Sequence, residues 1–116
     1  MRCKIFFKNQ IINIYVETYY NGRIRLMYGT ENDKKNITLD LKKIYLTSDK
    51  VAINPEIVKN NLFHLLIKEK IIKNIVSSIN YKGSEIPICS INLGILRKYD
   101  LVGVNKYLKR RGRYAK

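Results

Sequence analysis

Residues 11–28 decide the fold, and they read IINIYVETYYNGRIRLMY. Before Asn21-Gly22, isoleucine, valine and threonine alternate with polar or aromatic residues, which is the two-residue period of a β-strand. Residues 23–28 alternate in the same way. Asn and Gly both tolerate a positive φ angle, which a two-residue type I′ turn requires. This stretch therefore predicts a β-hairpin with its turn at Asn21-Gly22.

Further strands are predicted after this hairpin. Residues 29–35 are polar and are expected to form a loop. Alternation or a short apolar run predicts strands over residues 36–42, 51–53 and 86–92, with Pro87 indicating an edge or a bulge. Residues 71–80 fit a helix and a strand equally well, and a turn is expected at residues 81–85.

One helix is predicted in the middle of the chain, at about residues 55–69. Asn54 can cap the helix, Pro55 suits its first turn, and Glu56 favours the positive end of its dipole. The fold class is therefore α+β, a small and mainly antiparallel sheet with one central helix. We expect a single domain over residues 1–96 and a basic C-terminal extension over residues 97–116, in which a short helix near 104–110 is an option.

The chain has 116 residues, with 23 lysines and arginines against nine acidic residues, a net charge of +14. This length suits one domain. No apolar stretch approaches the roughly 18–20 residues that span a bilayer. The apolar run at the start of the chain is too short for the hydrophobic region of a secretory signal peptide. These features predict a soluble protein of the cytoplasm with no membrane partner.

The positive charge is unevenly distributed. Lysine, isoleucine, asparagine and tyrosine are abundant, and all four have AT-rich codons, so coding bias explains part of the lysine content. Residues 97–116, however, hold eight basic residues against Asp100 alone, a net charge of +7. The first 96 residues supply the other +7, from 15 basic and eight acidic residues. Coding bias does not explain such clustering.

Residues for catalysis or metal binding are sparse. His64 is the only histidine, and no His, Cys, Asp or Glu cluster has metal-ligand spacing. Cys3 and Cys89 are expected to be reduced, buried thiols. Because no nucleophile motif or phosphate-binding loop occurs, we expect a protein that is not an enzyme, with no catalytic residues, cofactor, metal or small-molecule substrate.

Basic and aromatic residues form the remaining candidate site. Arg23 and Arg25 share one face of the predicted hairpin, where tyrosines could stack on bases. Cations that pair with phosphates and two tyrosines are concentrated near the C-terminus, at Lys106, Tyr107, Lys109, Arg110, Arg111, Arg113 and Tyr114. The alternatives are a solvated outer face of the sheet and a tail that only confers solubility.

Several short segments between residues 19 and 92 follow a recognisable order. They are YYNGRI at 19–24, NITLDL at 36–41, VAI at 51–53, the predicted helix, Ile71-Ile72, and Gly83 followed by IPIC at 86–89. In this order they resemble a family of small uncharacterised α+β domains carried by bacterial phages, plasmids and other mobile elements. The resemblance implies a host-defence inhibitor, including one of anti-CRISPR type, and it brings no catalytic residues.

These observations together predict a non-enzymatic binding protein. Its expected partner is nucleic acid, RNA rather than DNA, or a nucleic-acid-containing effector complex whose guide RNA it would compete for. A protein-interaction module is the alternative, either a homodimer or a domain that docks on an acidic partner. A ribosome-associated RNA-binding protein is also compatible with the basic C-terminus, and a small nuclease with dispersed acids is a third interpretation.

Overall fold

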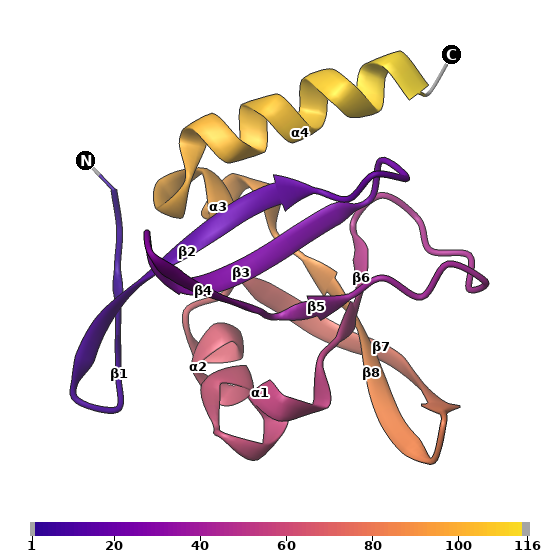
Figure 1. Cartoon of the computed structure of the whole chain (residues 1–116), viewed down its shortest axis with the longest axis horizontal. Helices are drawn as coiled ribbons and strands as arrows, with labels where there is room; N and C mark the ends of the chain where they lie inside the picture. The colour runs from indigo at the N-terminus through magenta and orange to yellow at the C-terminus, as the bar shows by residue number, and fades with distance from the viewer. Residues whose placement is uncertain (1, 115–116) are drawn as a thin grey trace.

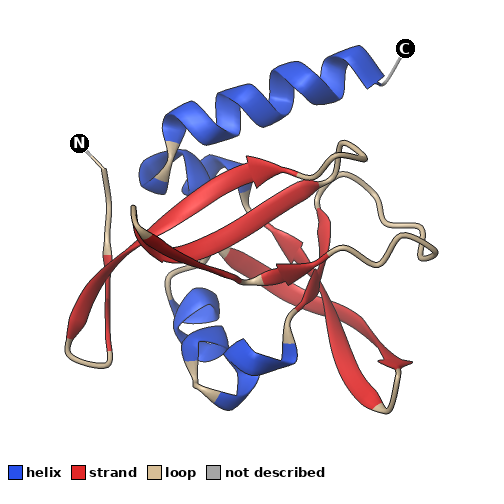
Figure 2. Ribbon diagram, viewed as in Figure 1, coloured by secondary structure: helices blue, strands red, loops and turns tan. Residues whose placement is uncertain are grey.

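The computed structural model describes residues 2–114, with side chains up to Arg111. In this part of the chain, two four-stranded antiparallel sheets and four helices form an α+β fold, which confirms the predicted class (Figures 1 and 2). The central helix and the C-terminal extension differ from the prediction, as described below. No helix among the described residues is long and apolar enough to cross a membrane.

The first sheet is a meander of four strands in chain order. They are β1 (Ile5–Phe7), β2 (Gln10–Thr18), β3 (Ile24–Thr30) and β4 (Asp33–Asn36). The predicted hairpin of β2 and β3 is confirmed. The predicted loop at residues 29–35 is instead the end of β3, a two-residue turn and β4, whose residues are mostly exposed and thus lack an apolar face.

The β2–β3 turn is one residue longer than predicted. The backbone N–H of Tyr19 donates to the carbonyl of Arg23 at 2.7 Å, which leaves three residues in the loop. Gly22 has a φ of 90°, whereas Asn21 is not among the residues with positive φ. A type I′ turn needs positive φ at both central residues, so this turn is a three-residue loop that relies on glycine alone.

The second sheet has the strand order β5-β6-β8-β7. Its strands are β5 (Thr38–Leu39), β6 (Lys50–Ile53), β7 (Ile72–Tyr81) and β8 (Ser84–Ile91). The ambiguous residues 71–80 therefore belong to a strand, and the predicted turn follows at Lys82 and Gly83, which both have positive φ. The strand predicted at 36–42 is interrupted at Ile37, where the chain passes from the first sheet to the second.

The predicted central helix is divided into two short helices, α1 (Pro55–Lys59) and α2 (Leu62–Lys68). The Asn54 side chain accepts a hydrogen bond from the Glu56 N–H at 3.1 Å, which confirms the cap. The single long helix was wrong because Asn61 adopts a left-handed conformation, with φ at 71°. Asparagine tolerates that conformation better than other non-glycine residues.

The C-terminal part of the chain folds onto the rest of the molecule. It forms α3 (Leu93–Tyr99) and α4 (Leu101–Tyr114), and α4 runs along β2 (Figure 1). Val104 and Tyr107 of α4 are buried in the same core cluster as the strands of both sheets. The expected extension at 97–116 is therefore not separate, because at least its first half completes the core.

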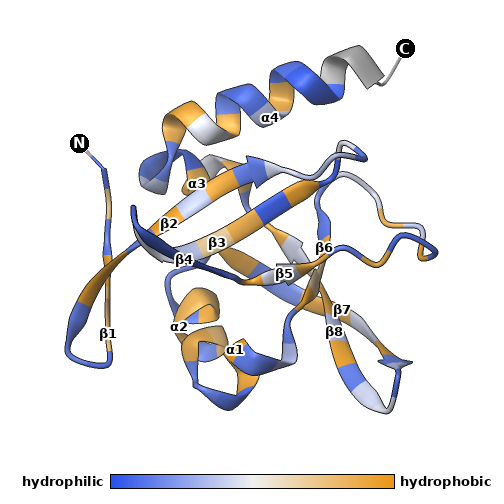
Figure 3. Ribbon diagram, in the orientation of Figure 1, coloured by the Kyte–Doolittle hydropathy of each residue, from blue (hydrophilic) through white to orange (hydrophobic). Residues whose placement is uncertain are grey.

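The core combines both sheets with all four helices, and hydrophobic residues alternate with hydrophilic ones along α4 (Figure 3). A second, smaller cluster lies under the loop between β5 and β6, around Leu41, Ala52, Ile86 and Ile88. Both cysteines are free, as expected. Cys89 is buried, and burial raises the pKa of its thiol to about 11, whereas Cys3 is exposed, contrary to expectation.

Candidate nucleic-acid interface

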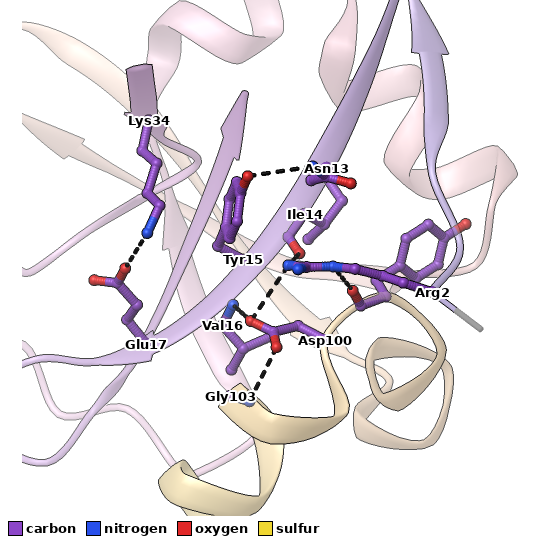
Figure 4. Close-up of polar contacts among 10 residues, drawn as sticks. Arg2, Asn13, Ile14, Tyr15, Val16, Glu17, Lys34, Asp100 and Gly103 are labelled. Carbon is purple, nitrogen blue, oxygen red and sulfur yellow. Dashed lines mark hydrogen bonds and ion pairs between the residues drawn. The ribbon is translucent and has the colours of Figure 1, made fainter. Parts of the chain in front are cut away.

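The inner side of α4 is fixed against the free edge of β2. Alternate residues of β2 direct their backbone groups away from β3, toward the N-terminal segment and α4. The carbonyl of Ile14 accepts a hydrogen bond from Arg2 Nη2 at 3.1 Å, and the N–H of Val16 donates to Asp100 Oδ2 at 2.9 Å (Figure 4). Side chains therefore satisfy backbone groups that a neighbouring strand would otherwise pair.

Asp100 also begins α4, because its Oδ1 accepts a hydrogen bond from the Gly103 N–H at 3.0 Å (Figure 4). A Cβ atom on Gly103 would lie 2.2 Å from the carbonyl oxygen of Val16, so only glycine fits this approach of helix to strand. Arg2 lies 3.7 Å from Asp100, whose side chain is only 16% exposed. The single acidic residue of positions 97–116 is thus directed inward.

Exposed cations lie along α3 and α4. Lys106, Lys109 and Arg111 are exposed on α4, and Arg97 and Lys98 are exposed on the preceding α3. We call these five residues the α3–α4 cationic face. The positive charges of this face are therefore exposed, whereas the carboxylate of Asp100 is directed at β2 and is largely withdrawn from solvent.

Tyr107 differs from the neighbouring residues of the predicted site. Its side chain is 1% exposed, and its hydroxyl donates a hydrogen bond to the carbonyl of Ser48 at 2.9 Å. Burial raises the pKa of this phenol, which favours the neutral, hydrogen-donating form. The structure thus places Tyr107 in the core, where it fixes the β5–β6 loop and offers no ring to a ligand.

Arg110 lies at the border between α4 and the β2–β3 turn. Its Nη2 atom donates to the carbonyl of Tyr20 at 3.0 Å, and its side chain is half-buried. Arg110 therefore links the helix to the hairpin. Arg113 and Tyr114 belong to the last turn of α4, and their side chains lie outside the part of the structure that is described.

The two hairpin arginines of the predicted site are engaged within the protein. Arg23 donates to the carbonyl of Leu41 at 2.8 Å and also to that of Ile44. Arg25 donates to Asn36 Oδ1 at 3.0 Å, and its guanidinium lies 5.5 Å from the centre of the Tyr19 ring. Arg23 thus holds the β5–β6 loop against the hairpin.

Tyr15, on the outer face of the first sheet, is also covered. Arg2 and Lys34 lie 4.8 Å and 4.5 Å from the ring centre of Tyr15, which is only 5% exposed. Lys34 also pairs with Glu17 at 3.4 Å (Figure 4). This face therefore fits the alternative of a self-contained outer surface better than a platform for bases.

A hollow of about 380 Å³ opens between the β2–β3 turn, the β5–β6 loop and α4. Its lining includes Tyr45, Lys50 and Arg111. Tyr45 is 86% exposed, and Tyr20 in the adjoining turn is 95% exposed. Neither tyrosine was predicted as a site residue, because alternation in the sequence places residues on strands but does not indicate the exposure of residues in loops.

A second hollow, of about 730 Å³, lies between α1 and the β7–β8 hairpin. Ile75 and Val76 of β7 line it and are half-exposed, together with Pro55, Val58 and Pro87. Figure 1 shows α1 and this hairpin on the side of the molecule away from α4. We call this hollow the β7 groove.

Within residues 2–114 no group of three or more His, Cys, Asp or Glu side chains could hold a metal ion. His64 is exposed on α2, and its ring lies edge-on to Phe63 at 6.1 Å. Comparisons of the chain with protein-family models, with curated proteins and with solved structures find no match.

Proposed function

We propose that this protein is a non-enzymatic nucleic-acid-binding protein that contacts phosphates through the α3–α4 cationic face. The observation that carries this proposal is the separation of charge on α4. Lys106 and Lys109 are exposed on its outer side and Arg111 is exposed beside the hollow next to Tyr107, while Asp100 is held against β2.

Phosphate contact suits the geometry of this face. Lys106 and Lys109 are one helical turn apart, so both can reach the phosphate backbone of one nucleic-acid strand. Each lysine or arginine that pairs with a phosphate releases condensed counterions, which makes the affinity fall as salt rises. Packing of Val104 and Tyr107 in the core fixes α4 before binding, so little ordering of the helix is needed.

The test is fluorescence anisotropy with short labelled single-stranded RNA, single-stranded DNA and duplex DNA, at about 50 to 200 mM salt. The K106E/K109E double variant should bind about tenfold or more weakly, and its log–log salt slope should be smaller by about 1.5. Truncation is a poor substitute, because removal of residues 105–116 would also remove the buried Tyr107.

The matched control is K68E/K73E, which changes the net charge equally. Lys68 ends α2 and Lys73 lies on β7, and both are exposed. This control should retain most of the affinity. Equal losses in the two variants would mean that only overall charge matters, and the α3–α4 cationic face would then not be the interface.

The mobile-element resemblance extends this proposal to inhibition of a host-defence ribonucleoprotein. A cationic helix face could compete with the effector for its guide RNA. The protein should then inhibit most when it is mixed with the guide before effector assembly, and K106E/K109E should inhibit weakly. Inhibition that is equal for the double variant would contradict guide competition and would indicate direct contact with an effector subunit.

A second candidate function is self-association through the β7 groove. The groove presents more apolar than polar surface, its Lys59 is paired with Glu56 at 3.8 Å, and it lies away from α4, so two copies could join with their cationic faces outward. Light scattering after size exclusion should then show a dimer that Val76→Asp abolishes and Val102→Asp on α4 preserves. A monomer at every concentration would exclude this candidate.

A further inference from the structure

We infer that the hollow beside the C-terminal half of α4, together with Tyr20 in the adjoining β2–β3 turn, is a binding site for single-stranded nucleic acid, in which bases stack on Tyr20 and Tyr45. This inference rests on the proposed function and adds a preference for unpaired strands. Figure 1 shows the β2–β3 turn and the β5–β6 loop at the end of the molecule where α4 terminates.

Exposure is the first argument. Tyr20 is 95% and Tyr45 is 86% exposed, whereas Tyr15, Tyr99 and Tyr107 are each less than 7% exposed. A phenol ring that is exposed to solvent contributes no free energy of burial to the fold of the ligand-free protein. Base stacking on such a ring requires a free base face, which a single strand offers and an intact duplex does not.

Anchoring of the loop is the second argument. Arg23 holds the loop at the carbonyls of Leu41 and Ile44, and the Tyr107 hydroxyl holds it at the carbonyl of Ser48. Tyr45 lies between these fixed points, so its backbone is positioned before a ligand arrives. A ring that is already positioned loses less conformational entropy on binding than a ring on a free loop.

Charge is the third argument. Arg111 of α4, Arg23 of the hairpin and Lys50 of β6 line the hollow. The nearest acids are engaged, since Asp40 lies 3.9 Å from Arg23 and Asp49 lies 3.2 Å from Lys50. Phosphates can therefore lie on cations while the bases reach the rings. Single strands are recognised by this combination of rings and cations.

The test compares Y20A/Y45A with the unmodified protein on single-stranded RNA, single-stranded DNA and duplex DNA. We expect the affinity for at least one single strand to fall about tenfold, with duplex binding nearly unchanged. The RNA and DNA arms identify which strand is the ligand. Both substitutions should leave the fold intact, because the rings are exposed and the hydrogen bond of Arg110 is to the Tyr20 backbone carbonyl.

Two controls make the result specific. Y20F/Y45F retains both rings and should restore the affinity for single strands. Tyr81→Ala, at the β7–β8 turn and 40% exposed, should have little effect. Equal losses for single strands and duplex, or unchanged binding by Y20A/Y45A, would overturn this inference and leave the phosphate-binding proposal standing. The proposal itself fails separately, if K106E/K109E retains full affinity for every nucleic acid.

Discussion

The strands β2 and β7 both have an edge that lacks a neighbouring strand, and the protein treats the two edges differently. Residues 13–18 of β2 lie beyond the β1 pairing, and side chains of Arg2 and Asp100 bond to the carbonyl of Ile14 and the N–H of Val16 in this stretch. β7 lies at the end of its sheet, and its register with β8 shifts twice, between Ile72 and Asn74 and between Ile75 and Ser77.

The difference shows two ways to prevent edge-to-edge aggregation. Bulges make β7 irregular, so that a further strand pairs poorly with it even though Ile75 and Val76 are half-exposed. A helix covers β2 instead, and this cover has a second effect. The contacts that seal β2 also hold α4 in place with its cations outward. We therefore expect substitutions at the β2 edge to affect both stability and binding, and those at β7 to affect neither strongly.

The largest effect is expected for Gly103→Ala. Its new Cβ would meet the Val16 carbonyl oxygen at 2.2 Å, so α4 must move away from β2. We expect the free energy of unfolding to fall by about 3 kcal/mol, measured by urea denaturation. Gly94→Ala in α3 is the control, because its Cβ meets only the Asn92 side chain, at 3.3 Å. A similar loss in both variants would contradict the close approach of α4.

Asp100→Ala should have the next largest effect. It removes the acceptor of the Gly103 N–H, which caps α4, and leaves the Val16 N–H without its partner. We expect a loss of about 2 kcal/mol in the free energy of unfolding. Hydrogen exchange should speed up at Val16 more than at Leu26, its β3 partner. Unchanged exchange at Val16 would show that the carboxylate does not protect this edge.

Tyr107→Phe should have a smaller effect, since it removes only the hydrogen bond to the Ser48 carbonyl. We expect a loss of about 1 kcal/mol in the free energy of unfolding. The β5–β6 loop should become more accessible to limited proteolysis, and affinity for single strands should decrease slightly because Tyr45 is less well positioned. Proteolysis at an unchanged rate would mean that Arg23 alone holds this loop.

The smallest effect is expected at β7. Ile75→Thr exchanges a half-exposed side chain for another β-branched one on the bulged edge. The free energy of unfolding should change by less than about 0.5 kcal/mol, in contrast to the β2 substitutions. A loss as large as that of Asp100→Ala would show that this edge is covered in solution, which would favour self-association through the β7 groove.

Local pattern was sufficient for the elements that alternate or carry a cap. The β2–β3 hairpin, β6 and the start of α1 at Asn54 were predicted, because each signal lies within a few neighbouring residues. β4 was missed because it has no apolar face, and the single long helix was wrong because Asn61 turns left-handed. Such single-residue conformations depend on tertiary contacts as well as on propensity.

The candidate site was predictable only in part. The cluster of cations in α4 was visible in the sequence, and Lys106, Lys109 and Arg111 are exposed as a site requires. The burial of Tyr107 had a signal, since Val104 and Tyr107 are one helical turn apart, but the surrounding charges concealed it. The contact of Asp100 with Val16 joins residues 84 positions apart, and no local pattern encodes it.

The inward direction of Asp100 also has a kinetic consequence. With its acid withdrawn and its cations exposed, α4 adds a local positive potential to that of the +14 chain, and this potential reaches about 8 Å into solution at physiological salt. Such a field turns an approaching polyanion toward α4 before contact and raises the rate of productive encounters. If α4 is the nucleic-acid interface, as proposed, added salt should slow association more than it speeds dissociation.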